Sequence, residues 1–270
     1  MTATADTVDA VSVTDLTKVF RVPGAKGGHT AVDRVSFTVG AGGSLGIVGE
    51  SGSGKTTIAR MLVGLERASS GSMAVAGRDR TQPARRSAER NRRARELQIV
   101  FQDPYTSLDP SQSARAAVEE VLRHHTRLTP SEREVRLTEL VDQVGLTDRQ
   151  AGARPRDLSG GQRQRVAIAR ALAAEPGVLI LDEAVSALDV SIQAQILNLL
   201  TDIRAETGIA YLLISHDLAV VRQLCDTVLV LRRGRLVEQG ACDQVLDAPA
   251  EEYTRALRAA VPVPGWRPGQ

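Results

Sequence analysis

The chain has 270 residues, of which 42% are hydrophobic, and a formal net charge of +2 at pH 7. This length suits one large domain or two small lobes, and the near-zero charge favours neither a nucleic acid nor an acidic partner. The two cysteines, Cys225 and Cys242, have no C-x-x-C spacing, which argues against a disulfide framework and against a thiolate metal cluster.

The apolar runs of the chain are short. Residues 209–214 and 227–231 have the length of a strand, well below the roughly 18 residues of a membrane span. The first ten residues lack the basic and apolar regions of a signal peptide. We therefore expect a soluble intracellular protein whose membrane contact, if it has one, is made through a partner.

Four strands and a glycine-rich loop are predicted in the first 76 residues. Residues 11–16 and 34–39 alternate like half-buried strands. The buried strand S-L-G-I-V at 44–48 is followed by G-E-S-G-S-G-K-T at 49–56 and then by a helix with Ile58, Leu62 and Leu65 on one face. A further strand is expected near residues 73–76.

The glycine-rich loop has the composition of a phosphate-binding cradle. Gly49, Gly52 and Gly54 allow a tight turn whose N–H groups point inward, and the N-terminus of the next helix attracts anions. Lys55 would reach the β- and γ-phosphates, and the Thr56 hydroxyl would bind Mg²⁺. The order strand, loop, helix therefore predicts an ATP site rather than a chance turn.

Eight arginines lie between residues 78 and 95, together with Asp79 and Glu89. A patch for nucleic acid or anionic lipid is one interpretation, and a solvated face is the other. We favour the solvated face, because no aromatic residues are interleaved for base stacking.

A helical pattern follows from residue 113 to about residue 157. The run T-P-S-E at 129–132 predicts a capped helix start, and Gly145 predicts its end. Apolar residues recur at helical spacing on both sides of this start, and His125 shares the face of the first three: Val118, Val121, Leu122, Val135, Leu137, Leu140, Val141 and Val144. We expect a small helical lobe inserted into an α/β core, followed by a glycine-rich turn, L-S-G-G-Q at 158–162, that opens another helix.

Strands and helices alternate after residue 158, which indicates a parallel sheet. Strands are expected at 178–182, 209–215 and 227–231, helices at 190–205 and 217–225, and a small hairpin at 233–234. The strand 178–182 ends in Asp182, which would hold Mg²⁺. Glu183 then points elsewhere, toward an attacking water, as a general base would.

Two more polar residues follow predicted strands. His216 could hydrogen-bond the γ-phosphate and the attacking water, since the strand ends of such a sheet converge on the ligand. Gln102 follows the apolar run 99–101 and could contact Mg²⁺ or water without adding charge. Asp189 is either the N-cap of the next helix or a contact across a dimer seam, and both readings stay open.

Together these motifs resemble the nucleotide-binding subunits of ABC transporters, over roughly residues 11–257. The resemblance implies an α/β fold: a P-loop NTPase core of ABC ATPase type with an N-terminal antiparallel β subdomain and an inserted helical subdomain. It places the ATPase domain at 11–258, with the core at about 11–100 and 160–245 and the helical subdomain at about 101–159. Residues 1–10 and 259–270 would be loose termini.

The resemblance also assigns roles to the motifs, with ATP and Mg²⁺ as cofactors. It names 49–56 as Walker A, 158–162 as the signature, 186–189 as the D-loop, Gln102 as the Q-loop residue and His216 as the switch. Glu183 and His216 would be catalytic, and Thr56, Gln102 and Asp182 would hold the metal. The nucleotide contacts that it implies are Phe20 (stacked on adenine), Gly49, Glu50, Ser51, Gly52, Ser53, Gly54, Lys55, Thr56, Thr57, Gln102 and, in trans from a second subunit, Ser159, Gly160, Gly161 and Gln162.

A finer resemblance is to the ATPases of dipeptide and oligopeptide importers. It rests on F-Q-D-P-Y-T-S-L-D-P at 101–110, on residues 182–200, and on P-x-x-x-Y-T-R-A-L at 249–257. Members of that subfamily also move nickel, glutathione or other small solutes, and many carry a longer C-terminal extension, some with a cysteine cluster that we do not expect here. A soluble ABC protein, a P-loop kinase and an exporter ATPase fit these motifs less well.

The finer resemblance implies the partners of the chain. They are a second ABC ATPase subunit (the same or a different chain), two membrane-spanning permease subunits and, indirectly, a solute-binding protein, with no nucleic acid. The chain would lie peripherally on the cytoplasmic face of the membrane. We expect the surface around Tyr105, Leu108 and Pro110 to bind a helix of a permease subunit.

Overall fold

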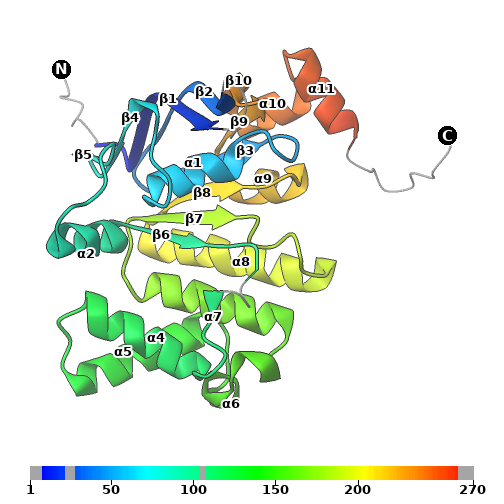
Figure 1. Cartoon of the computed structure of the whole chain (residues 1–270). Helices are drawn as coiled ribbons and strands as arrows, with labels where there is room; N and C mark the ends of the chain where they lie inside the picture. Colours follow the sequence, from blue (N-terminus) through cyan, green and yellow to red (C-terminus); the bar gives the residue numbers. More distant parts are fainter. Residues whose placement is uncertain (1–7, 22–27, 104–106, 261–270) are drawn as a thin grey trace, which may run out of the picture.

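Two β-sheets organise the computed structural model, which describes residues 8–21, 28–103 and 107–260 (Figure 1). The first sheet is antiparallel, in the order β2-β1-β4-β5: β1 (Val11–Arg21), β2 (Gly28–Val39), β4 (Ser70–Val75) and β5 (Arg78–Asp79). The second has the order β10-β9-β3-β8-β7-β6: β3 (Ser44–Val48), β6 (Leu97–Val100), β7 (Val178–Asp182), β8 (Ala210–Ile214), β9 (Thr227–Arg232) and β10 (Arg235–Ala241).

The second sheet is parallel from β9 to β6, and only β10 runs antiparallel, to β9. The carboxyl ends of β3, β6, β7 and β8 therefore meet at one edge of the sheet. This edge carries the residues that the sequence singles out: the loop after β3, Gln102 after β6, Glu183 after β7 and His216 after β8. The expected hairpin at residues 233–234 is confirmed as the β9–β10 turn, where Arg232 pairs with Arg235.

Successive apolar side chains along the parallel strands point to opposite faces of the sheet and pack into two hydrophobic cores. On β7, Val178 and Ile180 belong to the core between the two sheets, where α1 (Lys55–Leu62) also lies (Figure 1). Leu179 and Leu181 belong to the core on the other face of the parallel sheet. Because helices or strands cover both faces, these strands are apolar at most positions, and on β7 the exception is Asp182 at the carboxyl end.

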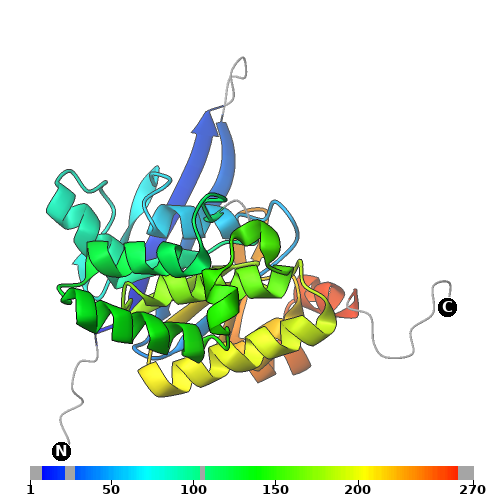
Figure 2. The same cartoon turned by 90° about the horizontal axis from the view of Figure 1, so that it is seen from below.

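Helices α7 (Gly160–Leu172), α8 (Val190–Thr207) and α9 (Leu218–Leu224) contribute to that second core. A helical lobe lies beyond them, built from α4 (Ala114–His125), α5 (Pro130–Gln143), α6 (Asp148–Gly152) and a 3-10 turn, η1 (Pro155–Asp157). Figures 1 and 2 both show α4 and α5 next to each other at one end of the molecule. No helix in the described ranges is long and apolar enough to cross a membrane.

The predicted helix starts and faces are mostly correct. Thr129 and Glu132 form the expected capping box at the start of α5, and Leu137, Leu140 and Val141 are buried. The predictions for two other residues are wrong. Leu65 is 64% exposed because α1 ends at Leu62, and Val135 is 61% exposed because it lies two residues from Leu137, on the opposite side of α5.

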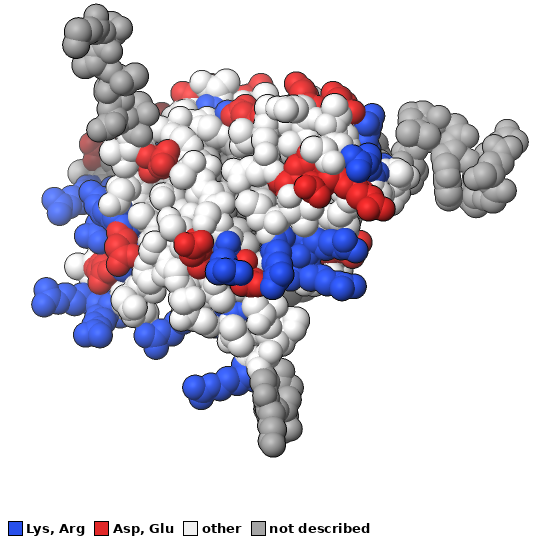
Figure 3. Space-filling view, turned by 90° about the horizontal axis from the view of Figure 1, so that it is seen from above, with Lys and Arg blue, Asp and Glu red and all other residues white. Residues whose placement is uncertain are grey.

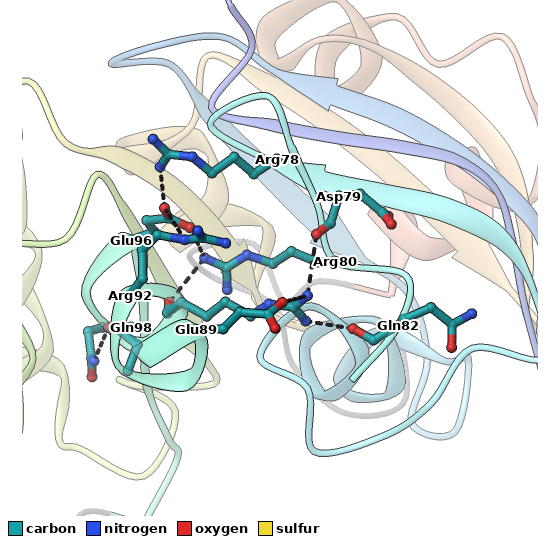
Figure 4. Close-up of polar contacts among 10 residues, drawn as sticks. Arg78, Asp79, Arg80, Gln82, Glu89, Arg92, Glu96 and Gln98 are labelled. Carbon is teal, nitrogen blue, oxygen red and sulfur yellow. Dashed lines mark hydrogen bonds and ion pairs between the residues drawn. The ribbon is translucent and has the colours of Figure 1, made fainter. Parts of the chain in front are cut away.

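The arginine-rich segment forms α2 (Ser87–Glu96), which has no buried residue, and the strand before it. The prediction of a solvated face is correct for α2. It is wrong for Arg80, which is buried at 5% exposure. Arg80 donates to Glu96 at 2.8 Å, and Arg78 pairs with the same carboxylate, as does Arg92 at 3.4 Å (Figure 4). One carboxylate therefore anchors three arginines between β5 and α2.

The remaining helices, α10 (Cys242–Asp247) and α11 (Glu252–Ala259), follow β10. Figure 1 places α11 toward the side of the molecule to which the arrowheads of β6 and β7 point. Side chains of both signs of charge are interspersed over the face seen from above in Figure 3.

Candidate nucleotide-binding site

The loop between β3 and α1 is packed tightly against two other strands. Gly49 has φ 148°, and a Cβ there would lie 2.2 Å from the carbonyl oxygen of Leu231 at the end of β9. Gly54 has φ 107°, and its Cβ would lie 2.3 Å from the carbonyl oxygen of Ala31 in β2. Only glycine fits at these two positions, so the loop backbone is held in one shape by β9 and β2.

Lys55 lies inside this loop. Its side chain is buried, and Nζ donates hydrogen bonds to the carbonyl oxygens of Gly49 at 2.7 Å and Glu50 at 2.9 Å. Burial lowers the pKa of Lys55, while the charges of Glu183 and Asp182 act to raise it. The Ser53 hydroxyl is buried with no hydrogen-bond partner among the described residues, so the loop holds a cation and a spare polar group, as a phosphate site requires.

A hydroxyl and a carboxylate meet beside the loop. Thr56 Oγ1 donates to Asp182 Oδ1 at 3.1 Å, and Asp182 is only 6% exposed. Burial raises the pKa of Asp182, and the Thr56 hydrogen bond opposes that rise. Both groups are oxygen ligands of the kind that Mg²⁺ prefers. The described residues include no cluster of three or more His, Cys, Asp or Glu side chains suited to a metal.

Glu183 and His216 meet across the ends of two neighbouring parallel strands. Asp182 pairs with Ile214 in the sheet, and the Glu183 amide donates to the Ile214 carbonyl at 2.9 Å. Glu183 has φ 50°, an unusual conformation for a residue with a side chain, which turns it away from the direction of the strand. The Glu183 carboxylate lies 3.4 Å from Nδ1 of His216, so a potential base and an imidazole are side by side.

Gln102 lies at the same edge and contacts the segment that follows Glu183. Its amide nitrogen donates to the Ser186 hydroxyl at 3.3 Å, and that hydroxyl donates to the Glu183 carbonyl at 2.9 Å. Farther along, Arg170 of α7 donates to the carbonyl of Ser107. The sequence did not indicate the contacts with Ser186 and Arg170, which connect the segment after β6 with the D-loop and with α7.

The signature residues lie at the start of α7. Ser159 and Gln162 form a reciprocal capping box, with distances of 3.3 Å and 2.8 Å. Gly161 faces Ile192 of α8, whose Cγ2 lies 2.4 Å from where a Cβ would be. None of the hydrogen bonds described for Ser159 and Gln162 reaches the loop 49–56, and their role in trans stays a prediction.

Three other predictions have different outcomes. Asp189 is the N-cap of α8 and accepts from the Ile192 amide at 3.0 Å, which confirms that alternative. Phe20 is half-buried near the end of β1, with Lys18 Nζ 4.6 Å from its ring centroid, and its adenine contact stays a prediction. Leu108 is 4% exposed and packs in the core with the helical lobe, so the prediction that it is a surface anchor is wrong. Tyr105 lies outside the described residues, and Pro110 is exposed.

Comparison with known proteins identifies the family. The family model described as ABC transporter matches residues 32–186, more than half of the chain. The chain belongs to the ABC transporter family. It is 49% identical over 234 residues to the probable peptide ABC transporter ATP-binding protein y4tS of Sinorhizobium fredii, covering 87% of this chain and 66% of that protein. It is 48% identical over 235 residues to the glutathione import ATP-binding protein GsiA of Escherichia coli, covering 86% of this chain but only 37% of GsiA.

A solved structure supports the same assignment. The dimeric ATP-binding cassette MJ0796, in a post-hydrolysis state with ADP and Pi, aligns with a TM-score of 0.77 and 28% identity. The alignment covers 86% of this chain and 98% of that one. These matches confirm the expected fold class and the resemblance to peptide-import ATP-binding proteins.

Proposed function

We propose that this chain is the ATP-hydrolysing subunit of an ABC importer for peptides of the dipeptide and oligopeptide type. One observation carries the ATPase part: the buried Lys55, the Thr56–Asp182 pair and the Glu183–His216 pair meet at one edge of the parallel sheet. Such an edge is where ligands bind in open α/β folds. The names of the relatives at 47–49% identity support peptide import.

The residues of this edge divide the work of hydrolysis. Lys55 and the loop amides would bind the phosphates of ATP, while Thr56, Asp182 and Gln102 would hold Mg²⁺, whose charge would offset that of the phosphates. Glu183 takes the proton of the attacking water, and His216 orients that water and the γ-phosphate. Phe20 stacks on the adenine. The ATPase domain would span residues 11–258.

A second ABC ATPase subunit, identical or different, completes the proposed site. Ser159, Gly160, Gly161 and Gln162 would close on the ATP held by the Walker A loop of the other subunit. Two permease subunits would bind the ATPase pair at the cytoplasmic face of the membrane, and a solute-binding protein would deliver the solute. The dimeric state of the MJ0796 cassette supports the pairing.

An importer of glutathione, nickel or another small solute of the same subfamily is the second candidate. The observation that favours it is the identity of 48% to GsiA, nearly equal to the 49% to y4tS. A soluble ABC ATPase without a transport role is a weaker third candidate.

Uptake in whole cells tests the proposal. A strain that lacks its own copy of this ATPase and carries the wild-type chain, Glu183→Gln or Asp202→Asn would be given labelled dipeptide and, separately, labelled glutathione. Asp202 is exposed on α8, so its variant makes the same carboxylate-to-amide change away from the site. We expect ATP-dependent dipeptide uptake with the wild type and Asp202→Asn only. Uptake of glutathione alone would favour the second candidate, and uptake of neither solute would contradict both a dipeptide importer and a glutathione importer.

A further inference from the structure

Tyr253 of α11 contacts the phosphate-binding loop, although the two are far apart in the sequence. The backbone N–H of Glu50, the second residue of the loop, donates to the Tyr253 hydroxyl oxygen at 3.4 Å, across a separation of 203 residues. The run at 249–257 includes Tyr253, but no sequence pattern indicates a contact between this tyrosine and the loop.

The peptide unit that Tyr253 contacts is the one that Lys55 contacts from its other side. The N–H of Glu50 and the carbonyl of Gly49 belong to the same planar peptide group, and in a trans peptide they point in opposite directions. The carbonyl end accepts from Lys55 Nζ at 2.7 Å, and the N–H end is held by Tyr253. Rotation of this peptide plane would therefore disturb the Lys55 ammonium and the tyrosine contact together.

The Tyr253 ring is itself held in place. The guanidinium of Arg232 lies over the ring, 4.7 Å from its centroid, and the ring packs against the core that includes the helical lobe. Arg232 directly follows Leu231, the residue whose carbonyl excludes a side chain at Gly49. The end of β9 therefore supports both the loop and the tyrosine.

Hydrogen bonds to a side chain of β10 hold the start of α11. The carboxylate of Glu238 accepts hydrogen bonds from the amides of Ala250 at 2.8 Å and Glu251 at 3.3 Å, just before the helix begins. Thr254, next to Tyr253, is 1% exposed. Burial raises the pKa of the Tyr253 phenol above its ordinary value. The hydroxyl is uncharged at neutral pH, and its oxygen lone pairs can accept the Glu50 N–H.

We propose that Tyr253 is a positioning residue for ATP binding: its hydroxyl fixes the peptide between Gly49 and Glu50 and thereby the Lys55 ammonium. The inference rests on the proposed function, since it requires that the loop binds ATP. It makes the C-terminal helix α11 part of the support of the nucleotide site. Any partner or chain segment that displaces α11 would weaken nucleotide binding without touching a nucleotide contact.

Three variants separate the hydroxyl from the ring. Tyr253→Phe keeps the ring and the Arg232 contact but removes the acceptor, and Tyr253→Ala removes both. Arg258→Gln is the control on the same helix, because the side-chain hydrogen bond described for Arg258 goes to the Asp247 carbonyl, at 2.7 Å, and Arg258 lies near the far end of α11. Each full-length protein would be assayed for the Kd of a fluorescent ATP analogue, for the KM and kcat of ATP hydrolysis, and for its melting temperature.

We expect Tyr253→Phe to raise the Kd and the KM by roughly two- to tenfold, the range of one hydrogen bond, with kcat and melting temperature close to wild type. Tyr253→Ala should weaken binding at least as much, and Arg258→Gln should not. We would also measure hydrogen exchange of a peptide spanning residues 46–54 without nucleotide. Exchange should be faster than in the wild type in Tyr253→Phe and unchanged in Arg258→Gln.

The opposite results would overturn the inference. If Tyr253→Phe binds the analogue and exchanges like the wild type, the hydroxyl positions nothing. If Arg258→Gln weakens binding equally, the effect belongs to the helix as a whole. A wild-type chain that fails to bind the analogue would instead refute the proposed function, and the exchange measurement would still decide whether Tyr253 holds the loop.

Discussion

Replacing Glu183 with glutamine tests the assignment of the catalytic base. The amide has the size of the carboxylate and can still hydrogen-bond the imidazole of His216, 3.4 Å away in the wild type. It cannot accept a proton from water. Loss of a positioned base costs roughly 10²–10⁴ in rate, which corresponds to about 3–5 kcal/mol in the activation free energy.

The structure predicts that nucleotide binding survives this change. The negative charge of Glu183 reaches the phosphate-binding loop, since it acts to raise the pKa of Lys55. Removing that charge reduces the repulsion of a triphosphate, so the affinity for ATP should be equal to that of the wild type or tighter. A variant that binds ATP and hydrolyses it slowly should accumulate with ATP as a closed dimer.

The assay compares wild type, Glu183→Gln and Asp202→Asn. Phosphate release at saturating ATP gives kcat, and light scattering coupled to size exclusion with ATP and Mg²⁺ gives the mass. We expect only Glu183→Gln to lose activity and to elute as a dimer. If it keeps more than about a tenth of the wild-type kcat, then Glu183 is not the general base, because the loss would fall below the range for a positioned base. A monomer under these conditions would count against a homodimer.

Other substitutions test the loop, the core and a surface ion pair. Lys55→Ala should weaken ATP binding at least about tenfold, because the loop loses a charge-assisted contact to the phosphates, and unchanged affinity by calorimetry would contradict the phosphate-loop assignment. Leu108→Ala should lower the free energy of unfolding by about 2–5 kcal/mol in urea, and the exposed-site control Val135→Ala by far less; equal effects would mean that Leu108 is not in the core. For Asp226, burial alone would raise the pKa, but hydrogen bonds led by that of Arg204 lower it below its usual value. The folded state then binds fewer protons than the unfolded state, so Asp226→Asn should cost about 1 kcal/mol near pH 7, and this cost should be lost only below about pH 4, as the pH falls through the lowered pKa of the folded state. A cost that is independent of pH in thermal melts would contradict that assignment.

The parts of the site that were predictable from the sequence are those made by neighbouring residues or by parallel strands. The loop 49–56 needs glycine where φ is positive, and that requirement is visible in the sequence itself. Asp182, Glu183 and His216 follow strands that run in the same direction, so their meeting at one edge follows from the topology alone. The identity of the side chains at this edge is therefore predictable from the sequence, whereas the distances between them are not.

Contacts that depend on how separate elements pack were not predictable. No helical or strand period in the sequence around Leu108 predicts its burial. Leu108 nevertheless packs in the core with the helical lobe, next to Ser107, whose carbonyl accepts a hydrogen bond from Arg170. The sequence around Arg80 is typical of a solvated arginine. Only the packing of α2 against this region brings Glu96, at the end of α2, to 2.8 Å from the Arg80 guanidinium. In both cases the partner is set by a helix whose position no local pattern encodes.

The contact between Tyr253 and the loop shows why such residues bear on function. A run at the far end of the chain gives no sign that it faces residue 50, because the contact exists only after β9 and β10 have brought α11 back to the carboxyl edge of the sheet. The peptide group that it holds is nonetheless one that also contacts the buried Lys55. The geometry of a phosphate-binding loop is therefore set by more than its own glycines. In this chain, Leu231 excludes side chains at Gly49, and Tyr253 orients the next peptide, so the strand and the helix that follow the catalytic motifs in sequence contribute directly to the shape of the site.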